Sequence, residues 1–65
     1  MDQEQLLRRR DVEATAKLSR SAIYAAMARG EFPTPVRIGP RSVRWRSSDV
    51  QAWIESRPSA REVAQ

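Results

Sequence analysis

The stretch LSRSAIYAAMARG, residues 18–30, decides the fold that this 65-residue chain is expected to adopt. Ser19 is a residue type favoured at helix N-caps, and Gly30 stands where a helix would end in a left-handed residue. Ile23 and Met27 lie four residues apart, so they share one helical face. The pattern predicts a capped helix of about three turns whose apolar face packs inward.

The remaining surface of this helix carries side chains suited to nucleic acid. Arg20, Ser21, Tyr24 and Arg29 project from the side that the apolar stripe leaves free. Guanidinium and hydroxyl groups together can bind both phosphates and base edges. We therefore expect a recognition helix, with Arg20 reading a base and with Ser21 and Tyr24 contacting bases and phosphates.

A shorter helix precedes the recognition helix. It is expected to open at Arg9 or Arg10, and Asp11 suits the positive end of its dipole. Val12 and Ala16 give it a thin inward stripe over about two turns. A short helix, a turn and a capped second helix form the helix-turn-helix pattern, in which the first helix braces the second in the major groove. Two packed helices without a ligand also fit this segment on its own.

Residues 36–46 predict a basic β-hairpin. The segments VRI and VRWR alternate apolar with basic residues, and the sequence GPRS between them is typical of a turn. The alternation predicts one packed face and one uniformly cationic face. The packed face is expected to hold Val36, Ile38, Val43 and Trp45, and the cationic face Arg37, Arg44 and Arg46, with Arg41 at the tip.

The net charge of the chain is concentrated in this hairpin. The sequence has 12 basic and 8 acidic residues, a formal charge of +4, and residues 36–46 contain arginines but no acid. Outside that segment the basic residues match the 8 acidic ones in number. A charge run by itself is more often a solvated face. Beside a recognition helix, however, it indicates a polyanionic partner.

A third helix is expected after the hairpin. Residues 47–49, Ser-Ser-Asp, supply a hydroxyl cap and an acid in the first turn, and Pro58 ends the helix. Trp45 and Trp53 lie on the inward phase of their elements, so both are assigned to the core, with a partner for each indole N–H. Base stacking on these tryptophans is the less favoured alternative.

Composition excludes several classes of function. The chain has no cysteine and no histidine, so it lacks the usual zinc ligands, the commonest general base and the strongest nucleophile. We therefore expect no metal, no cofactor and no enzyme activity. The polar N-terminus and the longest apolar run, residues 22–28, are unlike a signal peptide or a membrane span. A cytoplasmic, nucleoid-associated protein is expected.

The length allows one small domain, which buries only about 60% of the surface that the unfolded chain exposes. We assign residues 6–57 to this domain, residues 1–5 to a flexible N-terminus and residues 58–65 to a disordered tail. Leu6 and Leu7 are expected to form a short extended segment over the core.

Three segments in combination make the chain resemble a known family. LSRSAIY, GEFPTPVRIG and RSVRWRSSDVQAWI are similar to the AlpA family of phage and prophage regulators, small relatives of excisionases and of the MerR-type DNA-binding domain. The resemblance covers residues 6–57. It implies a small α+β winged helix-turn-helix that binds double-stranded DNA. Such a protein acts as a transcriptional regulator or as an excisionase-type directionality factor for a site-specific recombinase.

The resemblance also implies a set of DNA-binding positions. Lys17 departs from the family pattern, which commonly has glycine in this turn, and a left-handed lysine would cost on the order of 1 kcal/mol. No catalytic residue is implied. The DNA-facing positions are Arg20, Ser21 and Tyr24 on the helix and Arg37, Arg41 and Arg44 on the hairpin, or wing.

A single module of this size binds DNA with modest affinity, so useful specificity needs several copies. We expect a monomer in solution that binds repeated sites cooperatively, with a site-specific recombinase (integrase) as a candidate protein partner. The alternative function is a protein-interaction adaptor that engages a recombinase or repressor through the basic face. RNA binding is less favoured because no exposed aromatic platform is predicted.

Overall fold

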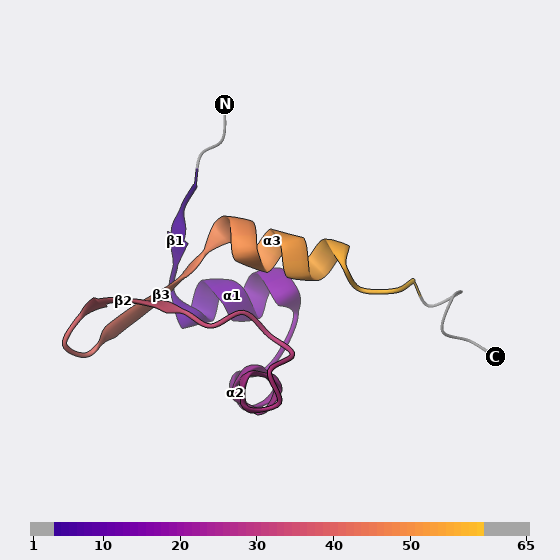
Figure 1. Ribbon diagram of the computed structural model, residues 1–65, viewed down its shortest axis with the longest axis horizontal. Helices are drawn as coiled ribbons and strands as arrows, with labels where there is room; N and C mark the ends of the chain where they lie inside the picture. Colours follow the sequence, from indigo (N-terminus) through magenta and orange to yellow (C-terminus); the bar gives the residue numbers. More distant parts are fainter. Residues whose placement is uncertain (1–3, 60–65) are drawn as a thin grey trace.

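Three short helices and a three-stranded antiparallel sheet make up the part of the chain that the computed structural model describes, residues 4–59 (Figure 1). The predicted small α+β class, the three helices and the hairpin are confirmed. The expectations for residues 1–3 and 60–65 lie outside the described residues. In chain order the elements are β1 (Leu6–Leu7), α1 (Arg9–Ala16), α2 (Arg20–Ala28), β2 (Val36–Gly39), β3 (Ser42–Arg46) and α3 (Ser47–Glu55).

The ends of α2 are capped as the sequence predicts. Ser19 Oγ accepts the backbone N–H of Ala22 at 3.1 Å, and Gly30 has a left-handed backbone with a φ of 73°. The turn between α1 and α2 also contains a left-handed residue, Lys17, with a φ of 59°. The backbone N–H of Lys17 donates to the carbonyl of Glu13 and so closes α1. Lys17 therefore has the left-handed backbone, for which a cost of about 1 kcal/mol is expected.

The core lies where the three helices meet the base of the sheet. Trp45 is fully buried, and its indole N–H donates to the carbonyl of Pro33 at 2.9 Å. Trp53 is half-buried at the edge of the core, and its indole N–H donates to the carbonyl of Glu31 at 2.8 Å. Both predicted indole partners therefore exist, but only one tryptophan is a central core residue. The buried residues are Val12, Ile23, Ala26, Phe32, Trp45 and Val50.

The sheet has three strands where the sequence predicts a two-stranded hairpin. β1 pairs antiparallel with the end of β3, with Leu7 opposite Trp45, and the strand order is β1-β3-β2. Gln5 extends the contact, because its backbone N–H donates to Ser47 Oγ and its carbonyl accepts the backbone N–H of Ser47, both at 2.8 Å. The predicted extended segment over the core is thus an edge strand, and β3 is the central one.

The serines at the start of α3 bind the N-terminal segment instead of capping the helix. Arg46 occupies the N-cap position and makes no side-chain capping bond. Ser47 Oγ accepts the backbone N–H of Gln5, and Ser48 Oγ donates to Glu4 Oε2 at 3.1 Å. The predicted hydroxyl cap is therefore wrong, because a segment distant in sequence takes both hydroxyls. Glu4 and Gln5, which the sequence assigns to a flexible N-terminus, are held by these bonds.

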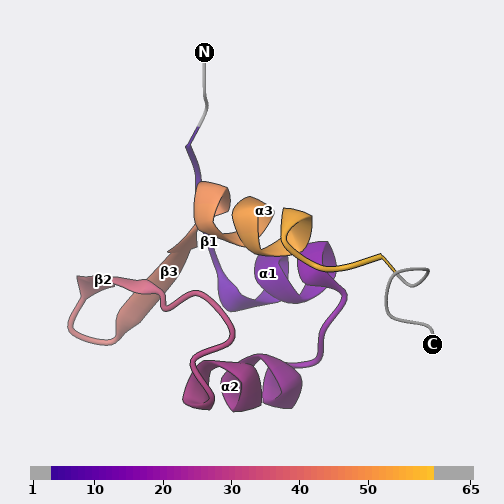
Figure 2. The same ribbon diagram turned by 45° about the vertical axis from the view of Figure 1, so that its right-hand side comes forward.

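The hairpin does not have the predicted division into an apolar and a cationic face. Val36 lies opposite Arg44, and Arg37 lies opposite Val43. Residues directly opposite each other share a face of the sheet, so each face carries both a valine and an arginine. The register is irregular after Arg37, and the side chain of Ile38 is 50% exposed. Figures 1 and 2 show the reason: the hairpin extends beyond the helices, so only its base is covered.

Candidate nucleic-acid interface

The outer surface of α2 presents the predicted recognition residues to solvent. Arg20 and Ser21 are exposed, and Tyr24 is 41% exposed. The inner surface of the helix is fixed by Ile23, which is fully buried. In Figure 2, α2 lies along one edge of the molecule. Since 20, 21 and 24 fall within about 100° of arc on a helix, the three side chains share one accessible surface.

Arg20 has no ionic partner among residues 4–59, unlike Arg9 and Arg29. Arg9 Nε lies 3.0 Å from a carboxylate oxygen of Glu13, and Arg29 Nε lies 2.9 Å from one of Glu31. These two arginines are neutralised, whereas the guanidinium of Arg20 keeps its donors available. An available guanidinium can bind a guanine edge or a phosphate through two parallel hydrogen bonds.

The side chain of Tyr24 on α2 lies near Arg9 of α1. The pKa of Arg9 is raised above its ordinary value, chiefly by the hydrogen bond to the Glu13 carboxylate and further by the hydroxyl of Tyr24. The Tyr24 side chain therefore lies within electrostatic reach of a residue on the preceding helix.

The hairpin holds its arginines in three different settings. Arg37 and Arg41 are exposed, and neither makes an ion pair within the described part of the chain. Arg44 is half-buried, and its guanidinium donates to a backbone carbonyl of its own strand at 2.8 Å. Arg46 lies 4.0 Å from Glu4. Because Arg37 and Arg44 lie on opposite faces of the hairpin, the structure does not bring the three predicted wing residues onto one surface.

The segments that form α2 and the hairpin carry positive charge without acidic interruption. Residues 14–30 and 32–48 contain no aspartate or glutamate. Glu31, between them, is paired with Arg29 at 2.9 Å. A polyanion approaching this part of the molecule would therefore meet cations on both elements.

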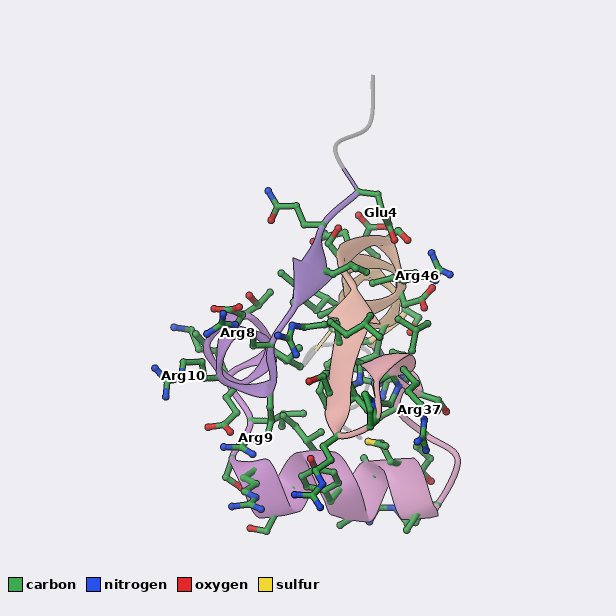
Figure 3. All side chains as sticks on the ribbon, turned by 90° about the vertical axis from the view of Figure 1, so that its left-hand side faces the viewer. Glu4, Arg8, Arg9, Arg10, Arg37 and Arg46 are labelled. Carbon is green, nitrogen blue, oxygen red and sulfur yellow. The ribbon has the colours of Figure 1, made fainter. Side chains whose placement is uncertain are left out.

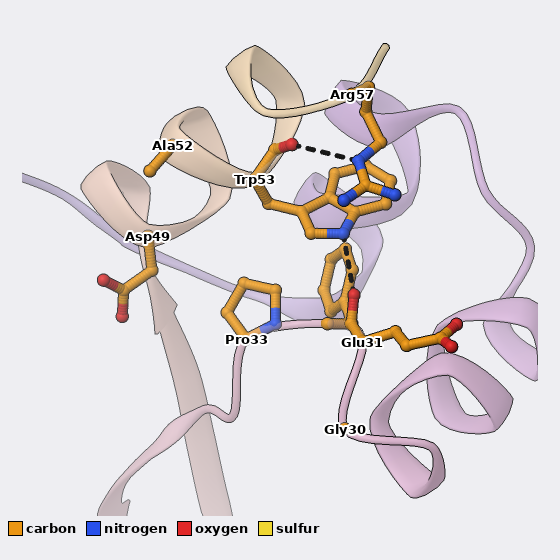
Figure 4. Close-up of a pocket in the computed structure, with 8 residues that line it drawn as sticks. Gly30, Glu31, Pro33, Asp49, Ala52, Trp53 and Arg57 are labelled. Carbon is orange, nitrogen blue, oxygen red and sulfur yellow. Dashed lines mark hydrogen bonds between the residues drawn. The ribbon is translucent and has the colours of Figure 1, made fainter. Parts of the chain in front are cut away.

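A shallow groove between the 30–33 loop and α3 has a different character (Figure 4). Its volume is about 780 Å³, and the acidic residues Glu31 and Asp49 are among those that line it. The rings of Phe32 and Trp53 meet edge to face with centroids 4.9 Å apart, and the Arg57 guanidinium lies 4.7 Å from the centre of the Trp53 ring. The Trp53 ring is thus already engaged, which argues against a base-stacking platform.

Two exposed arginines are absent from the predicted site. Arg8 and Arg10 flank Arg9 at the start of α1, and both are exposed. Three consecutive arginines are a visible signal in the sequence. The distribution of net charge does not reveal this signal, because the eight acidic residues offset all the basic residues outside the hairpin.

Comparison with known proteins supports the resemblance drawn from the three segments. A sequence profile of the family described as "Prophage CP4-57 regulatory protein (AlpA)" matches residues 5–58. The chain is also similar to "Uncharacterized protein ORF88" of Enterobacteria phage P4, with 42% identity over 60 residues, 92% of this chain and 68% of the relative. Among residues 4–59, no helix has the length and hydropathy needed to cross a membrane, and no cluster of acidic, histidine or cysteine side chains could hold a metal ion.

Proposed function

Because the chain belongs to the AlpA family of prophage regulatory proteins, we propose that it is a winged helix-turn-helix protein that binds double-stranded DNA sequence-specifically. In this proposal α2 enters the major groove and the β2–β3 hairpin is the wing. The observation that carries it is the exposed Arg20, which has no ionic partner in residues 4–59 and lies on a capped helix whose inner face is buried.

The residues of α2 supply the sequence-specific part of the contact. Arg20 binds the edge of a guanine, since an unpaired guanidinium matches the two acceptors that guanine presents in the major groove. Ser21 and Tyr24 flank it and contact bases and phosphates with their hydroxyls. No cofactor takes part in this binding.

The wing supplies the part of the contact that does not depend on sequence. Arg37 and Arg41 bind phosphates or the minor groove, because both are exposed and carry uncompensated charge in the described chain. Arg44 contributes less than the other two. It is half-buried, it donates to its own strand, and it faces away from Arg37.

The regulatory role has two forms that need the same interface. As a transcriptional regulator the protein binds an upstream region, and as an excisionase-type directionality factor it binds an attachment site beside a recombinase. In either form it acts in the cytoplasm, at the nucleoid. Fluorescence anisotropy with both duplexes and a random duplex tests the proposal. We expect tighter binding to one of the first two, whereas equal binding to all three would contradict sequence specificity.

Removing Arg20 tests the reading of a base. Arg20→Ala is expected to cost about 1–3 kcal/mol on the preferred duplex, about 5- to 150-fold in affinity, and little on random DNA. Arg29→Ala at the C-cap of the same helix is the matched control, because Arg29 is already paired with Glu31. Equal losses for Arg20→Ala on both duplexes would mean that specificity lies elsewhere, at the wing.

Useful specificity from so small a module needs more than one copy on the DNA. We expect the free protein to be a monomer that binds direct repeats cooperatively. Analytical ultracentrifugation and footprinting test this expectation. A stable dimer without DNA, together with a palindromic footprint, would contradict it.

A second candidate function is a protein-interaction adaptor, and one observation favours it. Ile38 is 50% exposed and Val43 is 38% exposed, so the hairpin presents apolar side chains to solvent. Such residues suit contact with a recombinase or a repressor. Weak DNA binding without salt dependence, together with partner binding that the double substitution Ile38→Thr and Val43→Thr removes, would favour the adaptor over the DNA-binding protein.

A further inference from the structure

The three arginines that begin the first helical segment have different surroundings. Arg9 is half-buried and is bound to Glu13 at 3.0 Å. Arg8 and Arg10 are exposed, and neither makes an ion pair with any residue from 4 to 59. Arg8 and Arg10 therefore each carry an exposed, unpaired positive charge within residues 4–59, and the charge of Arg9 between them is neutralised.

These two charges do not serve the stability of α1. Positive side chains in the first turn of a helix repel the positive end of the helix dipole. The start of α1 is instead secured by Asp11, whose carboxylate accepts the backbone N–H of Arg8 at 3.1 Å. The Arg8 and Arg10 side chains take no part in that bond, so their presence calls for another explanation.

The position of Arg8 and Arg10 relative to α2 supplies an explanation for these exposed charges. Figure 3 shows Arg8 and Arg10 on one side of the molecule, above the beginning of α2. Arg37 of the hairpin lies on the other side, above the later part of the same helix. The helix that carries Arg20 is thus bracketed by exposed arginines from two elements that are distant in sequence.

We infer that Arg8 and Arg10 form a second phosphate-binding site, which grips the DNA backbone on the side of α2 opposite the wing. The inference rests on the proposed DNA-binding function and extends it. The backbones of the two DNA strands border the major groove on either side, so a helix lying in the groove has phosphates on both flanks. The wing then holds one flank, and Arg8 with Arg10 holds the other.

Salt titration of DNA binding tests this site in the full-length chain. Each phosphate contact removed from double-stranded DNA lowers the slope of log affinity against log salt by about 0.9. The double variant Arg8→Gln, Arg10→Gln is therefore expected to lower the slope by about 1.8, on a random duplex as well as on the preferred one. The variant should melt at the same temperature as the parent chain or higher, because two charges unfavourable to the dipole of α1 are gone.

Arg57→Gln is the matched control for the loss of positive charge. Arg57 follows α3, which ends on the side of the molecule away from the start of α1 (Figure 1). Its guanidinium is engaged with the Trp53 ring at 4.7 Å. The salt slope of this variant should equal that of the parent chain. A fall in slope per lost charge that is as large for Arg57→Gln as for the double variant would show that the effect comes from net charge alone, and would overturn the inference.

Phosphate ethylation interference locates the two contacts. On the duplex that the parent chain binds most tightly, Arg8→Gln with Arg10→Gln should abolish interference at one set of phosphates, and Arg37→Gln with Arg41→Gln at another set. If the parent chain binds but the Arg8 and Arg10 variant keeps its full slope and interference pattern, the second site is absent while the proposed function stands. If the parent chain itself shows no salt-dependent binding to any duplex, the proposed function fails.

Discussion

The base and the outer end of the β2–β3 hairpin have the same alternation of apolar and basic residues but opposite environments. At the base, Trp45 is fully buried and hydrogen-bonded to Pro33. Farther out, Ile38 is 50% exposed and Val43 is 38% exposed. The difference teaches that alternation specifies a strand, whereas burial depends on whether a helix covers that part of the strand. The helices cover the base alone (Figures 1 and 2).

The two ends of the hairpin therefore have different roles. The base anchors the sheet to the helices, and β1 secures it further by pairing with the end of β3. The outer end has no packing role, so its arginines can be exposed to a ligand without loss of stability. Substitutions at the base should therefore change the free energy of unfolding, and substitutions at the outer end should change binding.

The largest effect is expected at the base. Trp45→Ala removes a fully buried side chain and leaves a cavity, at a cost of about 3–5 kcal/mol. Native domains have only about 5–15 kcal/mol of total stability, so this variant is expected to be largely unfolded. Urea unfolding followed by circular dichroism measures the loss. A cooperative transition within about 1 kcal/mol of the parent chain would show that the base does not anchor the fold.

The second tryptophan should give a smaller loss. Trp53 is half-buried at the edge of the core, where it contacts Phe32 and Arg57 and donates to the Glu31 carbonyl at 2.8 Å. We expect Trp53→Ala to cost about 2 kcal/mol, since only part of the ring leaves an apolar environment. The same urea titration compares the two variants. Equal losses would mean that the groove beside α3 is as important to the fold as the buried base of the hairpin.

These assignments separate what the sequence can predict from what it cannot. The caps of α2 at Ser19 and Gly30 follow from local backbone chemistry and could be predicted. The left-handed backbone of Lys17 is indicated only by the glycine that the resembled family commonly has in this turn. The pairing of Leu7 with Trp45 depends on contacts between segments distant in the chain, as does the use of the Ser47 hydroxyl. Local periodicity carries no information about such contacts.

The candidate site also combines features that the sequence can predict with features that it cannot. The exposure of Arg20, Ser21 and Tyr24 on α2 could be predicted from the position of the apolar stripe of this helix. The faces of the wing could not, because the register places Arg37 opposite Val43 and Arg44 opposite Val36. Which arginines have ionic partners also depends on the folded chain, where Glu13 lies beside Arg9. The positions of Arg8 and Arg10 beside α2 became visible only in three dimensions (Figure 3).

A tip residue should affect binding without affecting stability. Arg41 is exposed and makes no ion pair in the described chain, so Arg41→Ala should change the free energy of unfolding by less than about 0.5 kcal/mol. The salt slope of binding to random DNA should fall by about 0.9, as for one lost phosphate contact. Urea unfolding and a salt titration of anisotropy measure the two quantities. An unchanged slope would show that the tip of the wing does not bind phosphate.

The smallest effect is expected for the two exposed apolar residues near the outer end. Ile38→Thr with Val43→Thr keeps the β-branched side chains that strands favour and replaces methyl groups that already face water. A buried valine would lose stability on this change because of the added hydroxyl, but an exposed one has no such penalty. We therefore expect the free energy of unfolding to change by less than about 0.5 kcal/mol in urea titrations of the double variant. A loss above about 1.5 kcal/mol would mean that something covers these residues in solution. If that loss grew with protein concentration, the cover would be a second copy of the chain, and the outer end of the hairpin would be a packed surface like its base.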